Sequence, residues 1–368
     1  MGRKYVRTAY IAACVFLIIA AWRVETNRNR KAEAAQPVSV SASEPAPLPR
    51  DVPALIEEKP SDSGQLATLQ KQVEEQGKLI QELEETQNMP ERITEESAGG
   101  VALVVGSYVW MDSAGKRPLR FQGRDAAGDY LRDKDGRELT SFDGDGPPVV
   151  REFEGTGFLL DSGHLLTSGY VLEPWELDPI FQNSNKDELT PSIEMIHAYF
   201  PGISKAANVK IDHSSADGEV VVCTLDGPEV PSTRLRISNR DKEPLGMALT
   251  YLGYPGGVDL LASMAPEDVK AEIYRYGTPA ADEVAGILAS RGYIHPISAQ
   301  SRVVEHGQNH IFFETLNNII NAGGPLLNNH GEVVAVSLST HPDFTSFSRA
   351  ILVAPMKSWI VNALSVLR

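Results

Sequence analysis

The most informative segment of the chain is Asn321-Ala322-Gly323-Gly324-Pro325-Leu326-Leu327-Asn328, in which two glycines and a proline precede a short apolar run. Two earlier segments accompany it, Gly155-Thr156-Gly157-Phe158-Leu159-Leu160 and Leu165-Leu166-Thr167-Ser168-Gly169-Tyr170-Val171. All three belong to residues 99–368, where short β-branched or apolar runs alternate with Gly, Asn and Asp turns. This alternation predicts a β-sandwich or a β-barrel.

Seven short runs in this part of the chain have the composition of strands. They are residues 101–105, 157–160, 193–199, 220–225, 248–252, 311–314 and 333–338. Two helices are expected to interrupt them. One begins at Thr278 and Pro279, an N-cap followed by a first-turn proline, and ends at Gly292; the other closes the chain at about 355–367.

The three quoted segments resemble the trypsin-like serine proteases of the HtrA/Deg branch. In that family a Gly-x-Gly-Phe strand leads to a Leu-Thr-x-x-His-Val segment with the catalytic base, an Asp heads a later apolar strand, and the nucleophile lies in Gly-Asn-Ser-Gly-Gly-Pro. Residues 253–256 (Gly-Tyr-Pro-Gly), 313–325 and 350–367 resemble further parts of the same domain. The resemblance therefore covers nearly all of residues 99–368.

The resemblance implies an all-β fold of two six-stranded antiparallel barrels, with the active site of the family between them. The first barrel is expected at about 99–235, the second at about 236–353, and a C-terminal helix at about 355–367. The peptide-binding PDZ module that often follows in this family is not expected, because the sequence stops after that helix.

The residues that carry catalysis in the family are replaced in this sequence. Tyr170 stands at the position of the His, Ala322 at that of the Ser, and Glu219 near that of the Asp, with Asp217 as the less favoured choice. Ala322 has no nucleophilic atom, and a phenol with a pKa of ~10 is no general base near neutrality. These replacements indicate a pseudoprotease.

The oxyanion hole is also altered. In the family a Gly two residues before the nucleophile supplies a backbone N–H, and here that position is Ile320. A β-branched residue adopts few of the conformations open to Gly, so an inward-pointing N–H is not expected. A shifted alignment is not favoured, because Ser168, Ser337 and Ser339 do not precede a Gly-Gly-Pro. The residues expected to bind an extended peptide by strand addition are Tyr170, Ile320, Asn321, Ala322 and Gly323.

Residues 1–31 have the features of a membrane anchor or an export signal. They contain seven basic residues and one acidic residue, and they include the uncharged, largely apolar run 8–22. Extended to residues 5–24, this run reaches the ~20 residues that a membrane-spanning helix needs. We expect an uncleaved single-pass anchor, with the bulk of the chain outside the cytoplasm, in a periplasm or at the cell exterior. The alternative is a cleaved signal peptide that ends at Ala21.

A linker and a helix follow this segment. Residues 32–60 are rich in Ala, Pro, Ser and Glu, which predicts an extended tether. Apolar residues between Pro60 and Pro90 recur at steps of three and four, which predicts a short coiled coil at 61–90. The seam residues are Leu66, Leu69, Val73, Gln76, Ile80 and Leu83. Such a helix either forms homo-oligomers or docks on its own domain, and the sequence leaves both open.

Charge and histidine spacing argue against several partners. The formal net charge is −15, and outside residues 1–31 the chain has 27 basic against 48 acidic residues, a balance that repels phosphate backbones. His306 and His310 have metal-ligand spacing only on a helix, and Gly307-Gln308-Asn309 predicts a hairpin turn instead. We therefore expect no nucleic-acid partner, no metal and no cofactor.

Two further features have structural explanations. The pattern Asp-x-x-Gly occurs four times, at residues 112–115, 125–128, 133–136 and 143–146. It suits type I turns and lacks the alternating ligands of a calcium loop, so it predicts hairpin turns. Cys223 lies among valines and is expected to be a small buried hydrophobe.

The sequence is best interpreted as a membrane-anchored, catalytically inactive trypsin-like protein that binds or scaffolds a protein or peptide partner, whose identity the sequence does not give. Two alternatives remain open. One is an active serine endopeptidase with non-standard catalytic residues. The other is a structural coiled-coil membrane protein whose barrels are inert.

Overall fold

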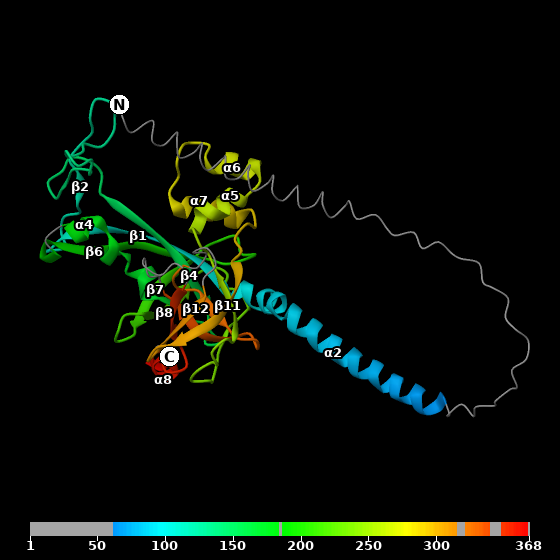
Figure 1. The fold of residues 1–368 in the computed structure, drawn as a ribbon. Coiled ribbons are helices and arrows are strands. Elements are labelled where there is room, and N and C mark those ends of the chain that lie inside the picture. Colours follow the sequence, from blue (N-terminus) through cyan, green and yellow to red (C-terminus); the bar gives the residue numbers. More distant parts are fainter. Residues whose placement is uncertain (1–61, 184–185, 315–320, 339–346, 367–368) are drawn as a thin grey trace, which may run out of the picture. The chain divides into compact units, whose positions relative to one another are not determined.

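The computed structural model describes residues 62–183, 186–314, 321–338 and 347–366 (Figure 1). The chain divides into two compact units, residues 1–69 and 70–368. The predicted anchor at 1–31 and the linker at 32–60 lie outside the described residues. Among the helices that the structure describes, none is both long and apolar enough to cross a membrane.

The first barrel is a closed ring of six antiparallel strands in the order β1-β4-β5-β8-β7-β6. The strands are β1 (Val101–Asp112), β4 (Val150–Leu159), β5 (Leu165–Ser168), β6 (Leu189–Tyr199), β7 (Ala207–Ser214) and β8 (Val220–Asp226). Strand β1 is buried on both faces, because Leu103 and Val105 pack in one apolar cluster while Ala102 and Val104 pack in another. A strand covered on both faces is apolar at successive positions, as residues 101–105 are.

The second barrel is also a ring of six antiparallel strands. Its order is β13-β10-β11-β12-β15-β14, and the pairing of β13 with β14 closes it. The strands are β10 (Ala248–Gly253), β11 (Ile297–His306), β12 (His310–Glu314), β13 (Pro325–Leu327), β14 (Glu332–Ser337) and β15 (Phe347–Leu352). A short strand, β9 (Arg236–Ile237), pairs in parallel with β14 outside the ring. Two closed six-stranded barrels confirm the predicted trypsin-like double-barrel fold.

Three helices form an insert between β10 and β11, coloured yellow in Figure 1. They are α5 (Gly257–Met264), α6 (Glu267–Ile273) and α7 (Ala281–Ser290). In sequence the insert lies between two strands of the second barrel, but its hydrogen bonds are made to strands of the first barrel. The Glu152 carboxylate accepts the Ala281 N–H (3.1 Å), the Glu154 carboxylate accepts the Val258 N–H (2.8 Å), and the Tyr199 hydroxyl donates to the Asp282 carboxylate (2.7 Å).

The sequence predicted part of this insert. As expected, helix α7 ends just before Gly292. The φ of Gly292 is +77°, a backbone conformation that glycine adopts more readily than other residues. The predicted start at Thr278 was wrong: Ala280 occupies the N-cap position, and the first-turn N–H of Ala281 is satisfied by Glu152. Helices α5 and α6 were missed. They are 8 and 7 residues long, which is too short for a clear helical period.

Helix α2 (Asp62–Ser97) is longer than the predicted segment 61–90 and continues through Pro90. Tertiary contacts hold the residues beyond the proline. The side chain of Ile93 is buried, and the Thr94 hydroxyl contacts the Ser298 hydroxyl at 2.8 Å. Val73, in the predicted seam, is 66% exposed. A coiled coil between copies of this helix stays a prediction.

Short elements complete the description. They are η1 (Ala98–Gly100), β2 (Arg120–Phe121), β3 (Thr140–Ser141), α3 (Gly169–Leu172), η2 (Pro174–Leu177), α4 (Pro179–Asn183), η3 (Lys186–Glu188) and α8 (Lys357–Val366). Helix α8 corresponds to the C-terminal helix predicted at 355–367.

Three of the four predicted Asp-x-x-Gly turns are confirmed, in the connection between β1 and β4. Gly115, Gly128 and Gly136 each donate their N–H to the carbonyl of the Asp three residues earlier. The fourth is wrong, because Gly144 donates to Ser141 and Gly146 donates to Phe121. The turn there begins two residues before the Asp of the motif.

Candidate functional site

Asn321 is the centre of a hydrogen-bond network that fixes the start of the Asn-Ala-Gly-Gly-Pro segment. Its Nδ2 donates to the carbonyl of Tyr254 (2.7 Å). Its Oδ1 accepts from the hydroxyls of Thr156 and Tyr251, both at 2.8 Å. Thr156 belongs to the first barrel and Tyr251 to the second, so this amide joins the two barrels.

Ser337 completes the network from strand β14. Its hydroxyl donates to the backbone carbonyl of Asn321 (2.7 Å) and accepts the N–H of Gly324 (2.9 Å). We call the four side chains Thr156, Tyr251, Asn321 and Ser337 the turn network. Because the polar groups of this segment are satisfied inside the protein, the network holds the backbone in one conformation.

Gly323 is required by the backbone geometry. Its φ is +89°, in the region that favours glycine, and its N–H donates to the Ser337 carbonyl (2.8 Å). A Cβ at this position would lie 1.9 Å from the carbonyl oxygen of Thr156. The preceding residue, Ala322, accepts the Thr156 N–H at 3.1 Å, and its half-buried methyl group packs on the core of the first barrel. Ala322 therefore lies at the junction of the barrels.

Tyr170 lies in helix α3, directly after strand β5. Ser168 is the N-cap of this helix, and its hydroxyl accepts the Tyr170 N–H (3.2 Å). The helix starts against the turn before β8, because the Gly169 N–H donates to the Glu219 carbonyl (3.0 Å) and a Cβ on Gly169 would lie 1.8 Å from the Gly218 carbonyl oxygen. The tight turn brings Tyr170 beside Glu219.

Glu219 is the centre of a charged cluster that spans the two barrels. Its Oε2 lies 2.5 Å from Nε2 of His310, and its Oε1 lies 3.0 Å from Nη2 of Arg349. The same Nη2 donates to the hydroxyl oxygen of Tyr170 (3.1 Å). We call Tyr170, Glu219, His310 and Arg349 the inter-barrel cluster. The Glu219 side chain is 13% exposed, so its charge is largely removed from water and needs these partners.

Asp217, the less favoured sequence candidate, has a local structural role. Its Oδ1 accepts from the Ser215 hydroxyl (2.5 Å) and from the Glu219 N–H (3.2 Å). The Ser215 hydrogen bond keeps the pKa of Asp217 below its ordinary value. Asp217 therefore shapes the turn that presents Glu219.

Two aromatic side chains flank the cluster on the outer face of the second barrel. Phe312 is the direct cross-strand partner of Arg349, and Phe347 lies two residues before Arg349 on the same face of β15. Phe312 is 38%, Phe347 40% and Tyr170 42% exposed. Three half-exposed rings thus surround one arginine whose guanidinium is held by Glu219.

The structure brings most of the predicted site residues to this junction. Tyr170 and Glu219 meet through Arg349, while Asn321, Ala322 and Gly323 follow one another in the segment tied to Thr156. Ile320 lies outside the described residues. Sequence reasoning missed His310 and Arg349 as site residues. His310 is 91 positions from Glu219, and Arg349 is 179 positions from Tyr170, so no local motif connects them.

The remaining candidates have the positions expected for structural residues. Burial raises the pKa of the Cys223 thiol well above its ordinary value, which makes it a poor nucleophile. The predicted turn at 307–309 is confirmed as the hairpin between β11 and β12. In the part of the chain that the structure describes, no group of three or more His, Cys, Asp or Glu side chains is placed to hold a metal ion.

Comparison with known proteins gives likenesses in structure only. No family model and no curated protein matches the chain. Similar solved structures include a serine endoprotease from Yersinia pestis, at 14% identity and TM-score 0.41, covering 76% of this chain and 68% of that one. Another is Deg5, at 13% identity and TM-score 0.41, covering 74% of this chain and 92% of that one.

A third similar structure is Rv3671c from M. tuberculosis H37Rv, a serine-to-alanine mutant in an inactive form. It has 15% identity and TM-score 0.37, with 57% of this chain and 82% of that one covered. The class of this protein, a trypsin-like double β-barrel, follows from the closed strand order of the chain itself.

The geometry defines what this junction can do chemically. The imidazole of His310 is paired with a carboxylate, and the phenol of Tyr170 accepts a hydrogen bond from a guanidinium. Ala322 presents a methyl group at the end of the turn network. The arrangement can fix the two barrels against each other and present an aromatic, arginine-centred surface.

Proposed function

We propose that this protein is a trypsin-like module that binds a protein or peptide and does not hydrolyse it. The observation that carries the proposal is the inter-barrel cluster. Tyr170 and Glu219, at the positions of the base and acid, are bonded to Arg349 and not to each other. Ala322 offers no nucleophile. Loss of a nucleophile and its base costs ~10⁶ in rate, which leaves no useful turnover.

The exposed face around Arg349 supports a binding role. Tyr and Arg are enriched at the energetic centres of protein interfaces, and aromatic rings supply large contact areas. Tyr170, Phe312 and Phe347 are exposed rings that surround Arg349, whose guanidinium is already oriented. An extended segment can add main-chain hydrogen bonds to such a face, with the rings contacting its side chains.

Fluorescently labelled unfolded casein is a suitable probe for the full-length protein. We expect saturable binding by anisotropy, no cleavage on a gel, and no labelling by a fluorophosphonate. Arg349→Ala with Phe312→Ser should weaken the binding at least tenfold. Tyr276→Ser is the matched control, because Tyr276 is 94% exposed on the helical insert and should leave the affinity unchanged.

Other outcomes of this experiment would contradict the proposal in different ways. Cleavage with fluorophosphonate labelling would identify an active endopeptidase with rebuilt chemistry. Folded protein that neither binds nor cleaves casein would leave the barrels inert and favour a purely structural role.

Membrane attachment and self-association are further parts of the proposal. Residues 5–24 would anchor the chain, and helix α2 would associate between anchored copies, because confinement raises their effective concentration. Val73 is 66% exposed in the single chain, which leaves it open to a second copy. Val73→Asp with Ile80→Asp should abolish cross-linking of the membrane-reconstituted protein, since pairing would desolvate the charges. Unchanged oligomers would assign the contact to the barrels.

A further inference from the structure

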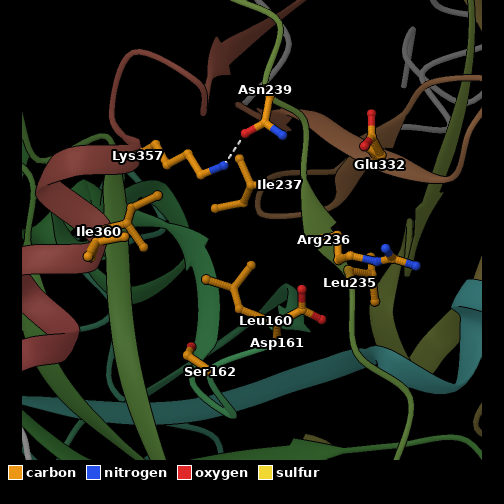
Figure 2. A pocket seen from close by; sticks show the side chains of 11 residues that line it. Leu160, Asp161, Ser162, Leu235, Arg236, Ile237, Asn239, Glu332, Lys357 and Ile360 are labelled. Carbon is orange, nitrogen blue, oxygen red and sulfur yellow. Dashed lines mark hydrogen bonds between the residues drawn. The ribbon is translucent and has the colours of Figure 1, made fainter.

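A pocket of about 340 Å³ lies beside the C-terminal helix α8 (Figure 2). It is lined by the turn after β4, by β9 and the residues that follow it, by the start of β14, and by α8. This volume falls in the range of small-molecule sites. The pocket shares no residue with the inter-barrel cluster or the turn network, so an inference about it is independent of the proposed function.

The floor of the pocket is aliphatic and fixed. Leu160, Leu235 and Ile360 line it and are 3%, 2% and 1% exposed, so their positions are set by the protein core. Ile237 of β9 adds a fourth aliphatic side chain. The branched aliphatic part of a ligand would contact side chains that the core already holds in place, so binding would cost little in ordering the protein.

Lys357 supplies a positive charge at one side of the pocket. Its ammonium donates to the side-chain oxygen of Asn239, and Figure 2 shows the two side chains pointing toward one another. An ammonium has three N–H donors, and this partner is an uncharged amide. The chain has 49 acidic and 34 basic residues. The Asn239 amide carries no charge, so it does not neutralise the Lys357 ammonium. An anionic ligand could neutralise it.

The opposite side of the pocket limits the charge of that anion. Asp161 and Glu332 also line the pocket, and in Figure 2 Leu160 and Ile237 lie between Asp161 and the Lys357–Asn239 pair. Arg236 is an exposed cation that also lines the pocket. Two carboxylates at the rim disfavour phosphate esters and other polyanions by like-charge repulsion. A single carboxylate at Lys357 avoids that repulsion.

We propose that this pocket binds a small molecule with one carboxylate on a branched aliphatic body. The carboxylate accepts from Lys357 and from the amide of Asn239, and the aliphatic body contacts Leu160, Ile237 and Ile360. A ligand in this position bridges α8 and β9. It therefore stabilises the docking of the C-terminal helix, and the protein should melt at a higher temperature in its presence.

N-acetyl-leucine is the probe that tests this chemistry on the full-length chain, with N-acetyl-leucinamide as its uncharged match. We expect N-acetyl-leucine to bind with a dissociation constant on the order of 0.1–1 mM by saturation-transfer NMR and calorimetry. The amide should bind at least tenfold more weakly, because it offers no charge to Lys357. Inorganic phosphate should not compete.

Three variants separate the charge from the fold. Lys357→Met keeps the aliphatic stem and should weaken N-acetyl-leucine binding at least tenfold. Asn239→Asp places a carboxylate beside Lys357 and should weaken it similarly without altering the lysine. Lys270→Met, at a surface pair with Glu267 on α6, is the control and should bind normally. The proposal is overturned by absence of binding at about 10 mM, by equal affinity for the amide, or by unchanged affinity of both pocket variants.

Discussion

Two polar groups of residues join the barrels, and they differ in chemistry. The turn network is neutral, three of its four side chains are buried, and it satisfies the backbone around Asn321 through hydrogen bonds of 2.7–2.8 Å. The inter-barrel cluster is charged and partly exposed, and its bonds run between long side chains. The first depends on the side chain of Asn321 and on its hydroxyl partners. The second depends on Glu219.

The two groups therefore have different roles: one fixes the backbone of the junction, and the other places charged side chains between the barrels. The turn network centres on Asn321 and fixes the backbone that leads into Ala322 and Gly323. The inter-barrel cluster contains Tyr170 and Glu219, two of the sequence-predicted site residues, and pairs both with Arg349.

The largest expected effect is on the turn network. Gly323→Ala should destabilise the protein by ~4 kcal/mol or more, because the new Cβ would meet the Thr156 carbonyl at 1.9 Å and the φ of +89° would be strained. Gly331→Ala is the matched control, since its φ is +72° and nothing lies within 4 Å of a Cβ there. It should cost only ~1 kcal/mol. Urea unfolding monitored by circular dichroism measures both, and equal costs would refute the steric argument.

Substitution in the inter-barrel cluster should lower the free energy of unfolding by less. Glu219→Gln keeps the shape of the side chain but leaves Arg349 without its carboxylate, and we expect a loss of ~2–3 kcal/mol. Glu267→Gln, at an ion pair whose glutamate is 90% exposed, should cost less than ~0.5 kcal/mol. The same unfolding experiment compares them. Equal, small losses would mean that the cluster contributes no more than a surface pair.

A third junction, between the first barrel and the helical insert, should depend on pH. Burial, with Asp259 and Glu152 nearby, raises the pKa of Glu154 to about 7 from an ordinary 4.5. The unfolded chain therefore ionises first, so the stability from this group is complete below pH 4.5 and is lost as the pH rises through 7. We expect a loss of ~2 kcal/mol between pH 5 and pH 8.

Glu154→Gln isolates this contribution. The variant should not show the loss of stability between pH 5 and pH 8 that is due to Glu154. Urea unfolding of both proteins at several pH values measures the difference in their free energies of unfolding. If the wild type instead gained stability relative to the variant as the pH rose from 5 to 8, the sign would be wrong and the assignment contradicted.

The smallest expected effect is that of Ala322→Ser. The added hydroxyl should change the stability by less than ~0.5 kcal/mol and should not produce hydrolysis of casein or peptide esters, because Tyr170 supplies no base. The minimum combination worth testing is Ala322→Ser with Tyr170→His and Ile320→Gly. Rapid hydrolysis by the single variant would show that the site had been misassigned.

Local signals in the sequence predicted a β-rich fold, and the resemblance to trypsin-like proteases implied that the strands form two barrels. Runs such as 101–105 and 220–225 lie in strands, and the Asn-Ala-Gly-Gly-Pro segment needs a glycine with positive φ at Gly323. Helix α2 was predicted to end at Pro90, because a proline interrupts a helix by propensity. Packing of Ile93 in the core outweighs that cost.

The inter-barrel cluster could not be predicted from local patterns. The residues before His310 predict a hairpin turn, and His310 is the first residue of β12 after that turn. Its pairing with Glu219 depends on how two barrels dock, and no spacing in the sequence encodes that. Arg349 gave no signal at all, because a single arginine in a strand is ordinary.

The continuity of helix α2 with the first barrel has a mechanical consequence. The helix ends at Ser97, η1 follows at Ala98–Gly100, and β1 begins at Val101. A tensile load on this helix would first meet the packed side chain of Ile93 and then the leading end of a 12-residue strand. Strand β1 is bonded along both edges, to β4 and to β6, so its hydrogen bonds would share the load in shear instead of opening one by one. Helix α2 therefore continues into a strand that is hydrogen-bonded on both edges.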